Sequence, residues 1–247
     1  MISLIPIESV WLWAFCLNAL LIAFAQRVPL LTRSGWVHAG ALGTILWGCL
    51  GWRGWLSVVL YLCFGSLVTR LGFARKKKAG LAEGRDGCRG PENLWGSAAT
   101  GACLALLIGA EFGSQKLLLI GFAASFAAKL ADTFGSEIGK RWGTKTVLIT
   151  SLKQVPVGTD GAISIEGTFA SVLGSFLMTF SIVSLFFVEI GSFGVLIFVM
   201  GFVATLFESF LGAVVQQRLV GLTNEMINFL QTCFAALTAM TIAYWWG

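Results

Sequence analysis

Apolar residues dominate this chain in long runs, which short polar or basic clusters separate. A helix needs about 20 predominantly apolar residues to cross a bilayer. The pattern predicts about eight spans of this kind, near residues 9–26, 36–51, 54–72, 94–110, 117–135, 166–188, 193–216 and 226–246. The second run is short and rich in glycine, so it either crosses the bilayer or is re-entrant. We expect an all-α, polytopic helical bundle that forms one integral-membrane domain over residues 1–247.

The composition narrows the class of protein further. Hydrophobic residues make up 57% of the 247 residues and charged residues 12%, and the mean hydropathy is +0.84. An ordinary soluble domain has about 25% charged residues and could not hide this much apolar surface from water. A soluble enzyme and a disordered protein are therefore excluded.

Basic residues gather in alternate loops between the predicted spans. Four loops carry most of them: one with Arg27 and Arg33, one near 73–93, one near 139–165, and one with Arg218. The other loops carry Arg53 and Lys116. Because cytoplasmic loops are enriched in Lys and Arg, we expect those four loops in the cytoplasm and both termini outside. If the second run does not cross, the N-terminus moves inside.

Acidic side chains occur within or beside the predicted spans, where each ionisable group costs about 2.5–3.5 kcal/mol on insertion scales. Asp132 and Glu137 follow the fifth span, Glu166 opens the sixth, Glu208 lies in the seventh and Asn228 follows the start of the eighth. The predicted orientation brings them all to the cytoplasmic end. A transporter would hold its site near the midplane, so a one-sided site favours an enzyme that meets a soluble cosubstrate and a lipid.

The loop near 139–165 adds cations and glycines to these acids. Lys140 and Lys153 carry positive charge, and Gly158, Asp160 and Gly161 form a turn-rich stretch. Carboxylates hold Mg²⁺, cations neutralise phosphates, and glycines let backbone N–H groups approach oxygen atoms. The loop therefore predicts a phosphate site, with a basic cytoplasmic loop that binds nothing as the alternative.

The loop near 73–93 contains two further features. Its lysine run, Lys76 to Lys78, is typical of an anchor for anionic lipids. Pro91 predicts a helix start, which places Arg89 and Asn93 where anions are favoured. The chain has no P-loop, HExxH or GxSxG motif, and we interpret the single histidine, His38, as a packing residue and the six cysteines as small buried residues.

Several stretches resemble the integral-membrane family that groups transmembrane protein 19 with the phytyl-phosphate kinases of plants and cyanobacteria. The matching stretches are residues 89–101, 131–139, 156–168 and 208–213. The shorter motif from Ser164 to Thr168 also resembles dolichol and phytol kinases, which use CTP. The resemblance implies phosphorylation of phytyl phosphate to phytyl diphosphate, which supplies tocopherol and phylloquinone synthesis.

Together, the residues and the resemblance define a candidate site for a kinase that uses Mg²⁺ and CTP or another nucleoside triphosphate. The expected catalytic and Mg²⁺-binding residues are Asp132, Glu137, Glu166 and Glu208. The expected nucleotide- or phosphate-binding residues are Arg89, Asn93, Lys140, Lys153, Gly158, Asp160, Gly161, Ser164, Gly167 and Asn228. We expect a prenyl lipid and a nucleotide as partners, no nucleic acid, and a location in the cell inner membrane or the thylakoid. A kinase for phytol or another polyprenol, and a transporter of lipids or small molecules, remain the alternatives.

Overall fold

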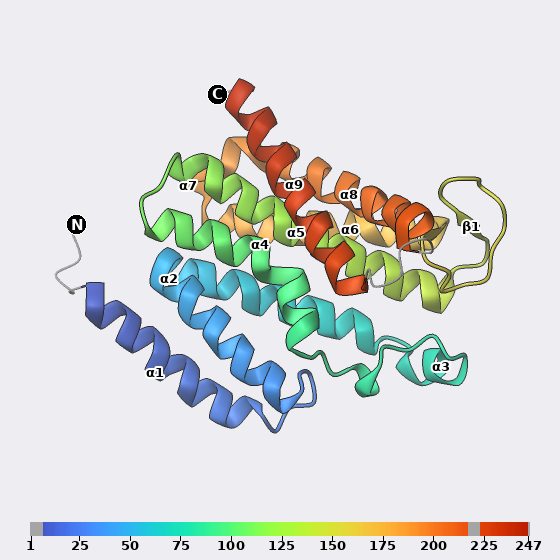
Figure 1. Cartoon of the computed structure of the whole chain (residues 1–247), viewed down its shortest axis with the longest axis horizontal. Helices are drawn as coiled ribbons and strands as arrows, with labels where there is room; N and C mark the ends of the chain where they lie inside the picture. Colours follow the sequence, from blue (N-terminus) through green and yellow to red (C-terminus); the bar gives the residue numbers. More distant parts are fainter. Residues whose placement is uncertain (1–6, 217–222, 247) are drawn as a thin grey trace.

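The computed structural model describes residues 7–216 and 223–246, and it is a bundle of helices (Figure 1). The long helices are α1 (Ile7–Ala25), α2 (Arg33–Arg70), α4 (Pro91–Gly109), α5 (Gln115–Trp142), α6 (Ile165–Leu185), α8 (Gly194–Leu211) and α9 (Asn224–Trp246). Shorter elements are α3 (Phe73–Lys78), α7 (Phe187–Ile190), two 3₁₀ turns (Arg85–Gly87 and Gly191–Phe193) and a π-helical turn (Gly212–Gln216). The predicted helical fold is confirmed. The loop after α5 adds a two-stranded antiparallel sheet of β1 (Thr146–Leu148) and β2 (Ala162–Ser164).

Helix α2 contains the second and third predicted spans, and it breaks between them. Gly51 at the break has φ 67° and ψ −164°, a conformation that is essentially restricted to glycine. Within the described residues, five helical stretches are long and apolar enough to cross a membrane: α2, α5, α6, α9 and the run 187–215 that contains α8. Residues 9–25 of α1 form a shorter apolar helix. The number of actual crossings therefore stays a prediction.

Helix α5 is the centre of the bundle. Its residues from Leu118 to Ala131 are all buried, and α4, α6, α8 and α9 pack around it. Large apolar side chains lie instead on the outer surface, among them Phe169 and Phe180 of α6. An outer surface of this kind suits lipid rather than water. Of the six free cysteines, Cys16, Cys63 and Cys103 are also exposed, which corrects the expectation that all six are buried.

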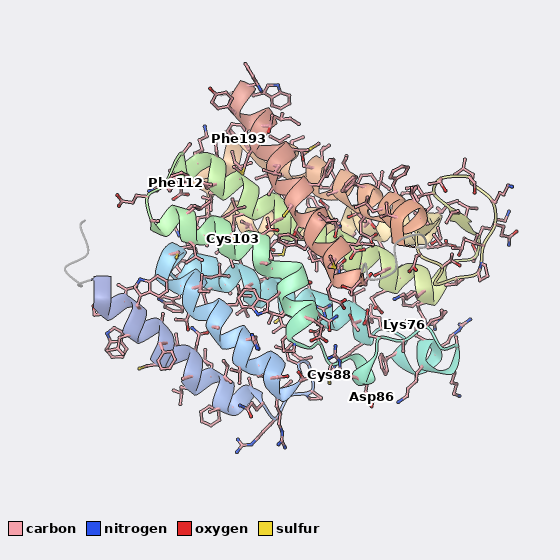
Figure 2. All side chains as sticks on the ribbon, in the orientation of Figure 1. Lys76, Asp86, Cys88, Cys103, Phe112 and Phe193 are labelled. Carbon is pink, nitrogen blue, oxygen red and sulfur yellow. The ribbon has the colours of Figure 1, made fainter. Side chains whose placement is uncertain are left out.

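The basic loops in the described part of the chain gather at one end of the bundle. The backbone N–H of Thr32, after α1, donates to the Arg89 carbonyl at 3.0 Å, which joins two of these loops. Lys76 and Asp86 lie toward this end in Figure 2, whereas Phe112 and Phe193 lie toward the other. At that other end Arg53 pairs with Glu189 at 3.3 Å. Arg218 lies outside the described residues, and which end faces the cytoplasm stays a prediction.

Candidate functional site

A polar cavity of about 240 Å³ lies at the end of the bundle that carries the basic loops. The second half of α5, the starts of α4, α6 and α9, the end of α8 and the loop around Gly158 surround it. The cavity brings together most of the side chains that the sequence singles out. Those that line it are Arg89, Asn93, Asp132, Glu137, Lys140, Gly158, Asp160, Gly161, Ser164, Gly167, Glu208 and Asn228.

The α5 wall of the cavity is one polar stripe. Lys129, Asp132, Ser136 and Lys140 follow one another at spacings of three or four residues and all line the cavity. Such spacing places side chains on one face of a helix. The predicted span ended at residue 135 and the predicted loop began at 139, but α5 continues to Trp142. The longer helix is what aligns these groups.

Lys129 is at the deep end of this stripe, and sequence reasoning did not assign it to the site. Its side chain is 7% exposed and pairs with Asp132. The carboxylates of Asp132 and Glu208 both attract the Lys129 ammonium group. Asp132 and Asp160 are close enough to repel Glu208. A lysine inside an apolar run was the signal that could have identified it, because such a residue is a functional candidate by default.

Glu137 lines the cavity, but its carboxylate is bound by a second lysine. Lys76 of α3 pairs with Glu137, and the two side chains are 1% and 2% exposed. Lys76 also donates to the Thr69 carbonyl at 2.8 Å. Lys76 therefore points into the protein, which corrects its interpretation as part of a lipid anchor. Nothing in the sequence distinguishes it from Lys77 and Lys78 beside it.

Glu166 and Lys153 do not line the cavity, contrary to the expectation from sequence. The Oε1 atom of Glu166 accepts hydrogen bonds from the Thr144 backbone N–H at 3.2 Å and from its Oγ1 at 2.6 Å. This contact ties the end of α5 to the start of α6. Lys153 is exposed on the loop after β1. The sequence places both residues near the site but cannot show that neither of them belongs to the lining.

The carboxylates that remain in the cavity do not form a closed metal cage. Among the described residues, no three Asp, Glu, His or Cys side chains are close enough together to hold a metal ion. The expected four-carboxylate Mg²⁺ site is therefore not preformed. Protein-bound Mg²⁺ commonly takes one or two carboxylates and completes its shell with substrate phosphates and water. Asp132 and Glu208, which both line the cavity, fit that mode of binding.

Arg89, just before α4, and Thr146 of β1 supply unpaired hydrogen-bond donors to the same cavity. Pro91 begins the helix as predicted, and the Gly90 N–H donates to Asn93 Oδ1 at 3.0 Å. The Arg89 guanidinium lies over the Tyr61 ring, 5.7 Å from its centroid, and its Nη1 is buried with no hydrogen-bond partner. The buried Thr146 Oγ1, also in the lining, lacks a partner too. Unpaired buried donors are rare in proteins and suit an anionic ligand.

Two of the cavity glycines, Gly161 and Gly167, have a packing role in the structure. Gly161 has φ +75°, and a Cβ added there would lie 2.4 Å from the Ala213 Cβ. A Cβ on Gly167 would lie 2.8 Å from the Gly135 carbonyl oxygen. Ser164 caps α6 by accepting the Gly167 N–H at 3.1 Å. These residues pack protein segments together, and their contact with a ligand stays a prediction.

Fold and cavity together define a polytopic membrane protein with a charged site at one end of its helices. The chain belongs to the family described as Integral membrane protein DUF92, which matches residues 16–236. An uncharacterized membrane protein of Synechocystis sp. is 46% identical over 239 residues, covering 94% of this chain and 91% of the relative.

Two further relatives show how widely the family is spread. The chloroplastic protein VTE6 of Arabidopsis thaliana is 35% identical over 238 residues, which cover 92% of this chain and 71% of VTE6. An uncharacterized membrane protein of Methanocaldococcus jannaschii is 32% identical over 237 residues, which cover 92% of this chain and 90% of the relative. No solved structure is significantly similar to the chain.

Proposed function

We propose that this protein is a membrane-embedded phosphotransferase that converts an isoprenoid monophosphate, phytyl phosphate, to its diphosphate. The observation that carries the proposal is the cavity at one end of the bundle, whose lining combines Lys129, Lys140 and Arg89 with Asp132 and Glu208. Cations beside carboxylates are the groups that bind and orient phosphates with Mg²⁺ during phosphoryl transfer. The similarity to VTE6 and the resemblance to phytyl-phosphate kinases support the choice of acceptor.

The proposed reaction needs little covalent chemistry from the protein. An oxygen of the acceptor phosphate attacks the γ-phosphorus of a nucleoside triphosphate such as CTP, and the bond from that phosphorus to the β–γ bridging oxygen breaks. The nucleoside diphosphate leaves. A phosphate monoester is already anionic, so no general base has to remove a proton from it. Bound Mg²⁺ would neutralise phosphate charge, and the protein would position the two substrates.

The residues that line the cavity have distinct roles in this proposal. Asp132 and Glu208 would hold Mg²⁺ together with the nucleotide phosphates, and Asp160 would contact it through water. Lys140 would bind nucleotide phosphates, and Lys129 would hold the Asp132 carboxylate in place through their ion pair. Arg89 and Thr146 would donate hydrogen bonds to phosphate oxygens.

The half of α5 away from the cavity argues against a transporter. Residues 118–128 are all buried and apolar or small, and their one hydroxyl, Ser125 Oγ, donates to the Phe122 carbonyl at 2.8 Å. Among the described residues, the charged side chains that are buried are Lys76, Lys129 and Glu137, all toward the cavity end. A transport path would need polar groups that continue to the far side.

The test is an assay of the purified protein with Mg²⁺ and a nucleoside triphosphate labelled at its γ-phosphate. Phytol and phytyl phosphate are offered separately, and CTP is compared with ATP, GTP and UTP. We expect label in phytyl diphosphate when phytyl phosphate is the acceptor and none when phytol is. Label in phytyl monophosphate from phytol would make the protein a polyprenol kinase instead. Absence of any labelled lipid would refute the proposed phosphotransferase.

A further inference from the structure

A second cavity of about 120 Å³ lies between α1, α2 and α4, and it is predominantly apolar. It shares four lining residues with the polar cavity: Tyr61, Arg89, Asn93 and Ser97. The two cavities are therefore neighbours, one suited to charge and the other to hydrocarbon. The boundary between them is the pair formed by the Arg89 guanidinium and the Tyr61 ring.

Away from Arg89, the polar side chains of Asn18, Trp36 and Trp55 in the walls of the apolar cavity make hydrogen bonds within the protein. The Trp55 indole N–H donates to Asn18 Oδ1 at 3.0 Å, and the Asn18 amide donates to the Ala14 carbonyl at 2.8 Å. The Trp36 indole N–H donates to the Val28 carbonyl at 3.3 Å. These satisfied donors leave apolar surface toward the cavity, from Leu21, Ile22, Leu42, Val58, Val59 and Leu62. Such a surface accepts a hydrocarbon and offers nothing to a nucleotide base.

Arg89 is held at the junction with a donor unused. A Cβ on Gly65 would lie 2.9 Å from Arg89 Nη2, so the guanidinium occupies space that this glycine leaves open. Nη2 is 3.4 Å from Thr69 Oγ1, whereas the buried Nη1 has no partner. A molecule that satisfies both cavities has an anionic group at Arg89 and an apolar chain that leads away from the phosphate site.

We propose that the cavity between α1, α2 and α4 binds the hydrocarbon chain of the isoprenoid monophosphate, with its phosphate at Arg89. The identity of the acceptor rests on the proposed function, but the site itself does not. In this arrangement the hydrocarbon chain extends toward α1 and α2, and the nucleotide lies toward α5 and α8. The reactive phosphate then lies between them.

The first test needs no catalysis. A C20 isoprenyl monophosphate that carries a diazirine at the end of its chain is photolysed with the purified protein, without nucleotide, and the labelled residues are mapped by mass spectrometry. We expect labels on cavity residues such as Ile22, Leu42 and Val59. Excess unlabelled C20 monophosphate should suppress them, and the same excess of a diacyl phospholipid should not. Labels confined to outward residues such as Phe169, equal suppression by the phospholipid, or no suppressible label would overturn the proposal.

The second test asks whether the cavity makes the protein selective for the length of the acceptor's hydrocarbon chain. Val59→Trp fills the cavity, and Leu67→Trp, at an exposed position of the same helical segment, is the matched control. We expect Val59→Trp to raise KM for the C20 monophosphate at least tenfold while KM for dimethylallyl monophosphate and kcat stay unchanged. Equal losses for both acceptors, or equal effects of the two variants, would contradict the proposal. If the wild-type protein transfers no phosphate, the proposed function fails and photolabelling alone decides the chain site.

Discussion

Lys140 and Lys153 carry the same charge and lie close together in the sequence, but only Lys140 lines the cavity. Lys140 is on the polar face of α5, whereas Lys153 is exposed on the loop after β1. If the cavity binds the nucleotide, the two residues differ in their effect on nucleotide affinity. Comparing variants of the two lysines therefore tests directly where the phosphates bind.

We expect Lys140→Met to raise KM for the nucleotide at least about tenfold, because a hydrogen bond to a charged group contributes about 1.5–3 kcal/mol and 1.4 kcal/mol is a factor of ten. Lys153→Met should leave KM within experimental error. Steady-state kinetics at saturating acceptor measures both. A larger effect of Lys153→Met would place the nucleotide on the outer loop and would contradict the cavity site.

The buried pair of Lys76 and Glu137 leads to a prediction about stability. Removing one partner of a buried ion pair leaves an uncompensated charge and costs about 3–5 kcal/mol. Lys76→Met should therefore lower the Tm in detergent clearly, and the double variant Lys76→Met/Glu137→Leu should recover much of the loss. Lys77→Met is the control, because Lys77 and its partner Asp86 are both exposed and such pairs contribute about 0–1 kcal/mol. Equal shifts in the two single variants would show that Lys76 is not buried.

Part of the site could be predicted from residue types in the sequence, and the rest could not, for identifiable physical reasons. Asp132 and Glu208 could be predicted because lipid disfavours carboxylates, and Arg89 because it precedes a helix start. Lys76 could not, because its burial depends on where α3 packs against α5. Glu166 has the right type and spacing, but its Oε1 accepts hydrogen bonds from Thr144, and the residue does not line the cavity.

At the scale of elements, the hydrophobic runs predict where the helices lie. They predict less accurately where each helix ends. Each predicted run corresponds to a helix or to half of α2. The end of α5 was misplaced because its last turns are polar and read as a loop, although they continue the helix to Trp142. The two-stranded sheet has strands of three residues, and such short strands leave no usable alternation in the sequence.

The break in α2 gives a prediction at this scale. Gly51→Ala should destabilise the protein by about 1–3 kcal/mol, because alanine is strained at this φ and ψ even though an added Cβ would meet no atom within 4 Å. Gly84→Ala is the matched control, since its Cβ also meets nothing and its φ is −58°. Thermal unfolding in detergent compares the two. An unchanged Tm for Gly51→Ala would mean that the segments 33–50 and 52–70 do not need this bend.

For the whole molecule, the convergence of the basic loops leads to a prediction about orientation. The loop between α4 and α5, which contains Glu111, and the loop between β1 and β2, which contains Lys153, lie at opposite ends of the bundle (Figure 1), so single cysteines at these two positions, in a variant without the six native cysteines, mark the two ends. An impermeant maleimide should label Glu111→Cys in intact cells and Lys153→Cys only after permeabilisation, because positive loops stay inside. The reverse pattern would place the polar cavity on the outer face.

The most direct test of the central claim is phosphoryl transfer by reconstituted protein in proteoliposomes, with γ-labelled nucleotide outside and phytyl phosphate in the bilayer. Three proteins are compared: wild type, Asp132→Asn in the cavity, and Glu189→Gln, an acid paired with Arg53 at the other end. We predict labelled phytyl diphosphate from wild type and Glu189→Gln, and a rate at least about 100-fold lower for Asp132→Asn, a loss of about 2.7 kcal/mol in transition-state stabilisation. Wild-type rates for Asp132→Asn, or nucleotide accumulating in the lumen with no diphosphate formed, would contradict the account.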